Sequence, residues 1–243
     1  MFAVLVPLRL NLYGQDISHR MGISEGLFSK LFTTRVAFLS KELPLLFPWP
    51  GKDRVNSWMP LSFRLKFPST RIIIDWLEVQ VQRPSSLLSQ SQTYSQYKSR
   101  NTMKLLVGFS SAGAVTFLSD VWGGRRSDRE ITTESDLIKK DLLEPGDSVI
   151  ADRGYDVEDV LAHERVLLNI PPYFNGRSLY FSENEVVQTR RIAELRIHVE
   201  RAIGRARNFT ILNCSLPANM ASLADEICKV CFLLTNFDQL LVK

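Results

Sequence analysis

Apolar and polar positions follow two different patterns along the chain, and the pattern changes near residue 70. Apolar residues recur at helical spacing in residues 11–40, whereas residues 46–69 are rich in proline and aromatic side chains and show no regular period. Beyond them, short apolar runs bounded by glycine, proline and serine are typical of buried strands. The pattern therefore predicts three parts: a small all-α module (1–45), a connector without regular structure (46–69) and an α/β domain (70–243).

The N-terminal module has the spacing of a helix-turn-helix around Gly22. Ser18 lies four residues before this glycine and Phe28 six residues after it, and Ser24 suits the N-cap of the second helix. A recognition helix would turn three polar side chains towards DNA: Ser24, Ser29 and Lys30. Any short helical hairpin with a glycine turn has the same spacing, so a hairpin that does not contact DNA is the alternative.

The α/β domain is predicted to form a mixed sheet flanked by helices. The expected strands are 72–81, 98–110, 114–121, 148–151, 166–170 and 209–216, and the expected helices are 128–143, 157–162, 183–208 and 221–234, with a loop over 84–95. A ribonuclease H-like fold has this order of elements: three strands, a helix, a fourth strand and then further helices.

Three acidic residues stand where these elements could bring them to one site. Asp75 lies in the first strand, and Glu78 points to the opposite face because side chains alternate along a strand. Asp152 follows the end of strand 148–151, where open α/β folds place their ligands, and Glu200 lies in the long helix. We expect folding to bring Asp75, Asp152 and Glu200 together as a divalent metal site, because carboxylate oxygens suit Mg²⁺.

Composition and charge allow a polyanionic partner without requiring one. The 243 residues carry a net charge of +4, and residues 190–207 hold six arginines against two acids. Cys228 and Cys231 sit among apolar residues and have no second ligand pair, so buried free thiols are favoured over a zinc or redox site. No apolar run reaches the length of a membrane span, and we expect none.

Seven motifs in one order resemble those of the DDE superfamily endonucleases of PIF/Harbinger-related transposases. They are IIDWLE (73–78), RPSS (83–86), SDVWGGRRSD (119–128), LEPGD (143–147), ADRGY (151–155), NIPP (169–172) and RIHVERAIGR (196–205). The resemblance runs from about residue 11 to the C-terminus. It implies a catalytic triad of Asp75, Asp152 and Glu200 that binds Mg²⁺, or Mn²⁺ in its place, and that cleaves and joins strands of double-stranded DNA.

The resemblance also implies a nuclear protein, present in the cytoplasm as well, and leaves open a second copy of the chain and an accessory DNA-binding protein as partners. Three arginines near the acids could meet DNA phosphates: Arg153, Arg201 and Arg205. Capping and the helix dipole are sufficient to explain Asp128. Its part at the metal site, like that of Asp120, is left open.

Two departures from the family pattern bear on activity. Trp76 stands beside Asp75 where such proteins often carry a small residue, and the chain begins almost at the predicted helix-turn-helix, whereas relatives carry further N-terminal sequence. The alternative function is therefore a retired transposase that keeps its fold and acts as a DNA- or protein-binding module.

Overall fold

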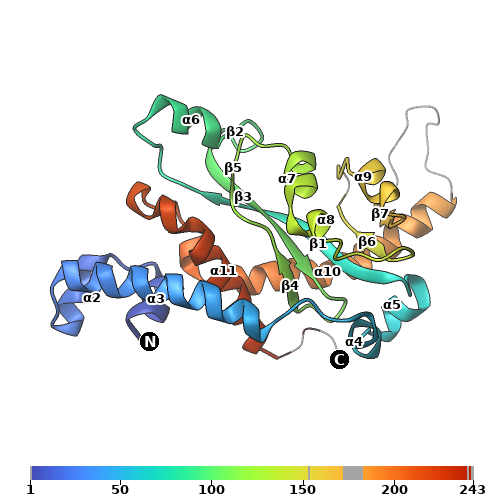
Figure 1. Cartoon of the computed structure of the whole chain (residues 1–243), viewed down its shortest axis with the longest axis horizontal. Coiled ribbons are helices and arrows are strands. Elements are labelled where there is room, and N and C mark those ends of the chain that lie inside the picture. Colours follow the sequence, from blue (N-terminus) through green and yellow to red (C-terminus); the bar gives the residue numbers. More distant parts are fainter. Residues whose placement is uncertain (1, 153, 172–182, 240, 242–243) are drawn as a thin grey trace.

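The computed structural model describes residues 2–152, 154–171, 183–239 and 241, and these form a mixed sheet flanked by helices (Figure 1). The strands are β1 (Thr70–Gln80), β2 (Tyr94–Ser95), β3 (Arg100–Phe109), β4 (Val115–Leu118), β5 (Trp122–Gly123), β6 (Ser148–Ile150) and β7 (Leu167–Asn169). They run in the order β2-β3-β1-β6-β7, and β4 and β5 also pair with β3. The central strand β1 is antiparallel to β3 and parallel to β6.

Helices cover both faces of this sheet. They are α1 (Phe2–Leu10), α2 (Gly14–Met21), α3 (Glu25–Leu46), α4 (Lys52–Ser57), α5 (Leu61–Lys66), α6 (Leu87–Thr93), α7 (Asp128–Glu134), α8 (Asp136–Lys139), α9 (Glu158–His163), α10 (Glu183–Arg207) and α11 (Ala224–Leu234). Three 3₁₀ turns add η1 (Thr210–Leu212), η2 (Ala218–Leu223) and η3 (Thr235–Phe237). None of the described helices combines the length and apolar content needed to cross a bilayer.

The alternation predicted for β1 is confirmed. Leu77 and Val79 belong to a core cluster that also holds buried residues of α3, α10 and α11. Ile74 and the partly buried Trp76 belong to a second cluster with buried residues of α8 and α9. β1 therefore carries apolar side chains on both of its faces, and each face is covered by a core cluster. This explains why the strand is apolar along almost its whole length, as is typical of strands that are covered on both faces.

Helices on either side of Gly22 are also confirmed. Gly22 has φ 65°, a left-handed conformation that ends α2, and the Ser24 hydroxyl accepts a hydrogen bond from the Leu27 amide at the start of α3. Phe28 is buried, whereas Ser29 and Lys30 are exposed. A DNA-binding role for this helical pair, and the domain boundaries drawn around it, stay predictions.

The connector is more regular than its composition suggested. The sequence predicts a region without regular structure over 46–69 apart from a short helical turn at 63–67. That turn corresponds to α5, whereas α4 is an additional helix. Pro50 lies just before the N-cap of α4 and Pro60 is itself the N-cap of α5, positions where the missing N–H is not needed. Likewise, α6 occupies part of the loop predicted over 84–95, because the Ser86 hydroxyl accepts a hydrogen bond from the Ser89 amide and caps it.

Two further predictions are wrong in detail. The single helix expected over 128–143 is divided into α7 and α8, because Ser135 adopts an extended conformation with ψ 155° between them. The strand expected over 209–216 is instead η1 followed by irregular chain. Of that segment, only Leu216 forms a β-bridge among the described residues, with Val81.

Candidate active site

Strand register places Asp75 and Asp152 side by side. Ile73 of β1 is the parallel partner of Ile150 of β6. Asp75 lies two residues after Ile73, and Asp152 lies two residues after Ile150. Neighbouring strands lie about 4.8 Å apart. The adjacency therefore follows from backbone pairing: Asp75 lies on the central strand, and Asp152 lies two residues beyond the end of β6.

The segment after Asp152 is packed against β1 by an aromatic pair. The rings of Trp76 and Tyr155 stack with centroids 5.6 Å apart and an interplanar angle of 19°. Tyr155 is buried, and Gly154 before it has φ 104°, which favours glycine at this turn. Trp76 thus points away from Asp75, to the opposite face of the sheet, and does not crowd the carboxylates.

A guanidinium group links the two aspartates. Arg196 of α10 donates a hydrogen bond from Nη1 to Asp152 Oδ1 at 2.5 Å, and its Nη2 lies 3.7 Å from Asp75 Oδ2. The Arg196 side chain is 15% exposed and that of Asp75 is 20% exposed. The positive charge at the centre of the site is therefore largely removed from water, which strengthens its interaction with the carboxylates.

Glu200 lies one helical turn beyond Arg196 on α10. Residues four apart lie on the same face of a helix, so Glu200 follows Arg196 along the face that meets the aspartates. Val199 and Ala202 on either side of Glu200 are buried in the core and fix the rotation of the helix. Glu200 itself is exposed.

The charged groups of the site shift the pKa of Asp75. Burial raises the pKa of Asp75 above its ordinary value, and the Asp152 and Glu200 carboxylates raise it further. The Trp76 amide, which donates to Asp75 Oδ1 at 2.8 Å, and the Arg196 guanidinium oppose that rise in pKa. The net direction is upward, so Arg196 does not fully offset the cost of ionising Asp75 in this environment.

Other carboxylates nearby have lysine partners of their own. Lys104 Nζ lies 3.1 Å from Asp128 and 3.7 Å from Glu78, which points away from Asp75 as expected. Asp120 is 80% exposed and pairs with Lys229 at 2.9 Å. These lysine contacts account for the positions of Asp128, Glu78 and Asp120 without a role for them beside Asp75 and Asp152.

The residues predicted to contact DNA fall into two separate regions. Arg201 is exposed on α10, and Arg205 donates to the backbone oxygen of Gln239, whereas Arg153 lies outside the described residues. The exposed side chains around the start of α3 lie at the opposite end of the molecule from β6 and β7 (Figure 1): Ser24, Ser29 and Lys30.

The donor chemistry of the site fits a hard divalent cation. Asp75 on β1, Asp152 just after β6 and Glu200 on α10 offer only oxygen ligands, which Mg²⁺ and Mn²⁺ prefer. Within the described ranges, no group of three or more His, Cys, Asp or Glu residues is placed to hold a metal ion. Arg196 provides the cation between Asp75 and Asp152 in this conformation.

Sequence reasoning missed Arg196 as a site residue. It counted this arginine only as part of the basic stretch of α10. The available signal was its position four residues before Glu200, because an arginine at this spacing shares the helix face of the acid.

The sheet and the two aspartates linked by Arg196 define a mixed α/β protein with an acidic site beside its central strand. A sequence model of the DDE superfamily endonuclease family matches residues 74–236, and the chain belongs to that family. The match contains Asp75, Asp152 and Glu200, and the family suggests nuclease activity of the transposase type on DNA. No curated protein matches the chain. The narrower likeness to PIF/Harbinger-related transposases stays a prediction.

Proposed function

We propose that this protein is a metal-dependent DNA endonuclease or transposase that cleaves and joins phosphodiester bonds at Asp75, Asp152 and Glu200. The observation that carries the proposal is the register of β1 and β6, which sets two carboxylates side by side with Arg196 between them. A DNA substrate would place the activity in the nucleus.

The strand order supports a ribonuclease H-like fold for the catalytic part. An antiparallel meander, β1-β3-β4, is followed by two strands, β6 and β7, that add in parallel on the other side of β1. Acids then stand on the central strand and just after its parallel neighbour, the arrangement expected of that fold.

The proposed chemistry assigns a role to each acidic residue. Asp75 and Asp152 would hold the metal from neighbouring strand positions, and Glu200 would complete the ligand set from α10. Two bound Mg²⁺ ions would supply Lewis acidity for attack by water, and then by a DNA 3′-hydroxyl, on a phosphodiester. Arg196 would fix the aspartate side chains before the metal binds, and Arg201 would meet DNA phosphates from the exposed face of α10.

The helix pair around Gly22 supports a second DNA contact. Ser24, Ser29 and Lys30 are exposed near the start of α3, as a recognition helix requires. We assign this module to binding DNA outside the cleavage site.

Nicking of supercoiled plasmid with Mg²⁺ or Mn²⁺ tests the proposal. Asp152→Asn and Glu200→Gln should each reduce nicking at least a hundredfold, because each removes a charged metal ligand. Asp120→Asn is the matched control, since this acid is exposed and pairs only with a surface lysine, and it should nick like wild type. An Asp152→Asn protein with wild-type activity would contradict the assignment of Asp152 as a metal ligand.

The second candidate function, a DNA- or protein-binding module without catalysis, rests on Arg196. A guanidinium between two aspartates supplies a permanent cation at the place where the first proposal puts metal. A folded wild-type protein that binds DNA but does not nick it with either metal, and is not stabilised by either metal, would favour this alternative.

A further inference from the structure

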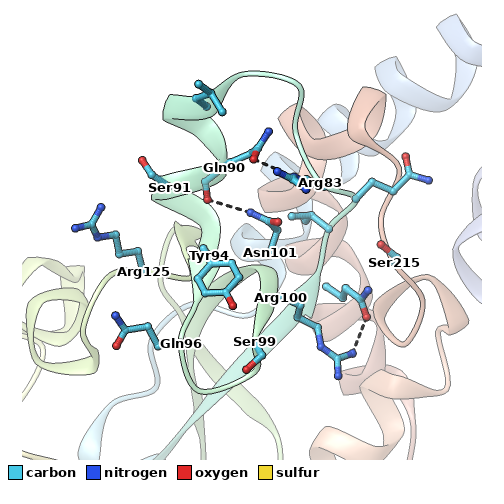
Figure 2. Close-up of a pocket in the computed structure, with 14 residues that line it drawn as sticks. Arg83, Gln90, Ser91, Tyr94, Gln96, Ser99, Arg100, Asn101, Arg125 and Ser215 are labelled. Carbon is cyan, nitrogen blue, oxygen red and sulfur yellow. Dashed lines mark hydrogen bonds between the residues drawn. The ribbon is translucent and has the colours of Figure 1, made fainter.

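A large open pocket lies where β1 ends, and Figure 2 shows the residues that line it. Its volume is about 900 Å³, within the ~300–1,000 Å³ range of ligand sites. It is lined by the end of β1, by α6, by the start of β3 and by the turn after β5. None of the catalytic acids lines it.

Three arginines from three separate segments line this pocket, and no acidic residue does. Arg83 follows β1, Arg100 begins β3 and Arg125 follows β5. None of the three forms an ion pair with a carboxylate among the described residues. Their positive charge is therefore not neutralised within this part of the chain, unlike that of Arg129 or Arg196.

Amide side chains orient two of these arginines. Arg83 Nε donates to Gln90 Oε1 at 2.9 Å, and Arg100 Nη1 donates to Gln80 Oε1 at 2.9 Å, as Figure 2 shows. A guanidinium has five N–H donors, so most of them stay available for a ligand. Neutral partners hold the side chains in place without cancelling their charge.

Close packing of two glycines fixes the third arginine. A Cβ atom on Gly123 would lie 2.4 Å from the Gln92 backbone oxygen, and one on Gly124 would lie 2.1 Å from Thr102 Oγ1. Only glycine permits this approach of the β5 turn to α6 and β3. It lets the Arg125 amide donate to the Gln92 oxygen at 3.2 Å, which holds Arg125 at the rim.

The remaining lining residues favour a nucleotide chain over a simple anion. Tyr94 is 45% exposed and offers an aromatic face to the pocket, on which a base could stack. Gln96 adds an amide group that both donates and accepts hydrogen bonds, as base edges and sugars do. Asn101 donates its two N–H groups to the Gln90 carbonyl and to Thr93 Oγ1, so only its Oδ1 is left to accept from a ligand. Phosphates, bases and sugars thus each find a complementary group.

We propose that this pocket binds an unpaired DNA strand, with the arginines on phosphates and Tyr94 stacked on a base. The inference rests on the proposed function and deepens it by adding a contact for the strand that leads to the site. Gln80 is five residues beyond Asp75 on β1, about 17 Å at the rise of a strand. A strand that reaches both places would span several nucleotides.

Fluorescence anisotropy with a labelled single-stranded oligonucleotide, in EDTA and at several salt concentrations, tests this binding apart from cleavage. Arg83→Gln combined with Arg125→Gln should weaken binding about tenfold and lower the slope of log K against log salt by roughly 1.4, about 0.7 per lost phosphate contact. Lys140→Gln combined with Arg165→Gln removes the same charge outside the pocket and should leave the slope unchanged.

Tyr94 provides an independent test of stacking. Tyr94→Ala should weaken binding by about five- to a hundredfold, whereas Tyr94→Phe keeps the ring and should bind like wild type. If the arginine pair behaves like its control and Tyr94→Ala binds normally while wild type still nicks plasmid, the pocket inference is overturned and the proposed function stands. A wild-type protein that neither binds the oligonucleotide nor nicks plasmid would overturn both.

Discussion

Arg196 decides how the site behaves before a metal binds. The carboxylates of Asp75 on β1 and Asp152 just after β6 repel one another, and Asp75 is largely buried, so removal of the guanidinium takes away the cation that both acids share. The same guanidinium opposes binding of a second cation at that place. One residue therefore stabilises the metal-free protein and weakens its affinity for metal.

The substitution Arg196→Gln separates these two effects. In EDTA it should lower the free energy of unfolding by about 1–3 kcal/mol, because the neutral amide leaves the Asp75 and Asp152 charges close together. Addition of Mg²⁺ or Mn²⁺ should then raise the melting temperature of the variant more than that of wild type, since the stabilisation by a bound ion grows with the logarithm of its concentration over its Kd. Thermal unfolding followed by circular dichroism measures both effects.

Arg20→Gln is the matched control, because this exposed arginine pairs with Asp16 within α2, at the other end of the molecule from β6 and β7 (Figure 1). Its metal-induced shift should equal that of wild type. Equal shifts for Arg196→Gln and wild type would show that Arg196 and the metal do not compete.

At the scale of elements, prediction from sequence succeeded where burial follows a regular period. β1, β3, α10 and α11 were placed to within a few residues because their apolar positions repeat with the strand or helix period. The break at Ser135 depends on the extended conformation of that serine, and α6 depends on capping by Ser86. The spacing of apolar residues gives no information about either. The contact of Arg196 with both aspartates needs the tertiary approach of α10 to the sheet, so only the three acids could be proposed beforehand.

Helix α11 carries a cysteine pair whose behaviour can be measured directly. Cys228 and Cys231 are buried free thiols, and Cys214 is partly exposed. Burial raises the pKa of Cys228 to about 12 and also raises that of Cys231. At pH 8 only about one part in ten thousand of Cys228 would be the reactive thiolate, whereas thiols with an ordinary pKa are about a quarter ionised.

Titration with a disulfide reagent at pH 8 should therefore modify one thiol, Cys214, quickly in the native protein. All three cysteines should react after denaturation. Reaction of the buried pair should speed up as pH rises, because the thiolate fraction grows. Fast native reaction of three thiols, or its suppression by zinc, would contradict the assignment of a buried apolar pair.

The whole molecule joins its N-terminal helices to the catalytic part through one core. α3 packs against α11, and the buried Phe28, Phe32 and Val36 of α3 belong to the same cluster as Leu77 and Val79 of β1. Two independent modules would instead keep separate cores. The continuity of this core indicates that the N-terminal helices stabilise the sheet, whether or not they also bind DNA.

Unfolding followed by two probes tests this coupling. Trp76 and Trp122 lie in the α/β domain and Trp49 and Trp58 in the connector, so tryptophan fluorescence reports the chain outside the N-terminal helices, whereas circular dichroism at the helical band reports the whole chain. Phe32→Ala removes a ring that is 2% exposed and should cost about 3–5 kcal/mol. Because the core is shared, both probes should shift to the same lower midpoint.

Leu31→Ala, one residue away and 36% exposed, is the matched control and should shift both midpoints far less. If Phe32→Ala lowers only the dichroism transition and leaves the tryptophan midpoint in place, the N-terminal helices fold as a separate module. The boundary predicted at residue 45 would then mark a true domain limit. A common shift would instead make the N-terminal helices part of one cooperative unit with the sheet that carries Asp75, as the packing of α3 on α11 predicts.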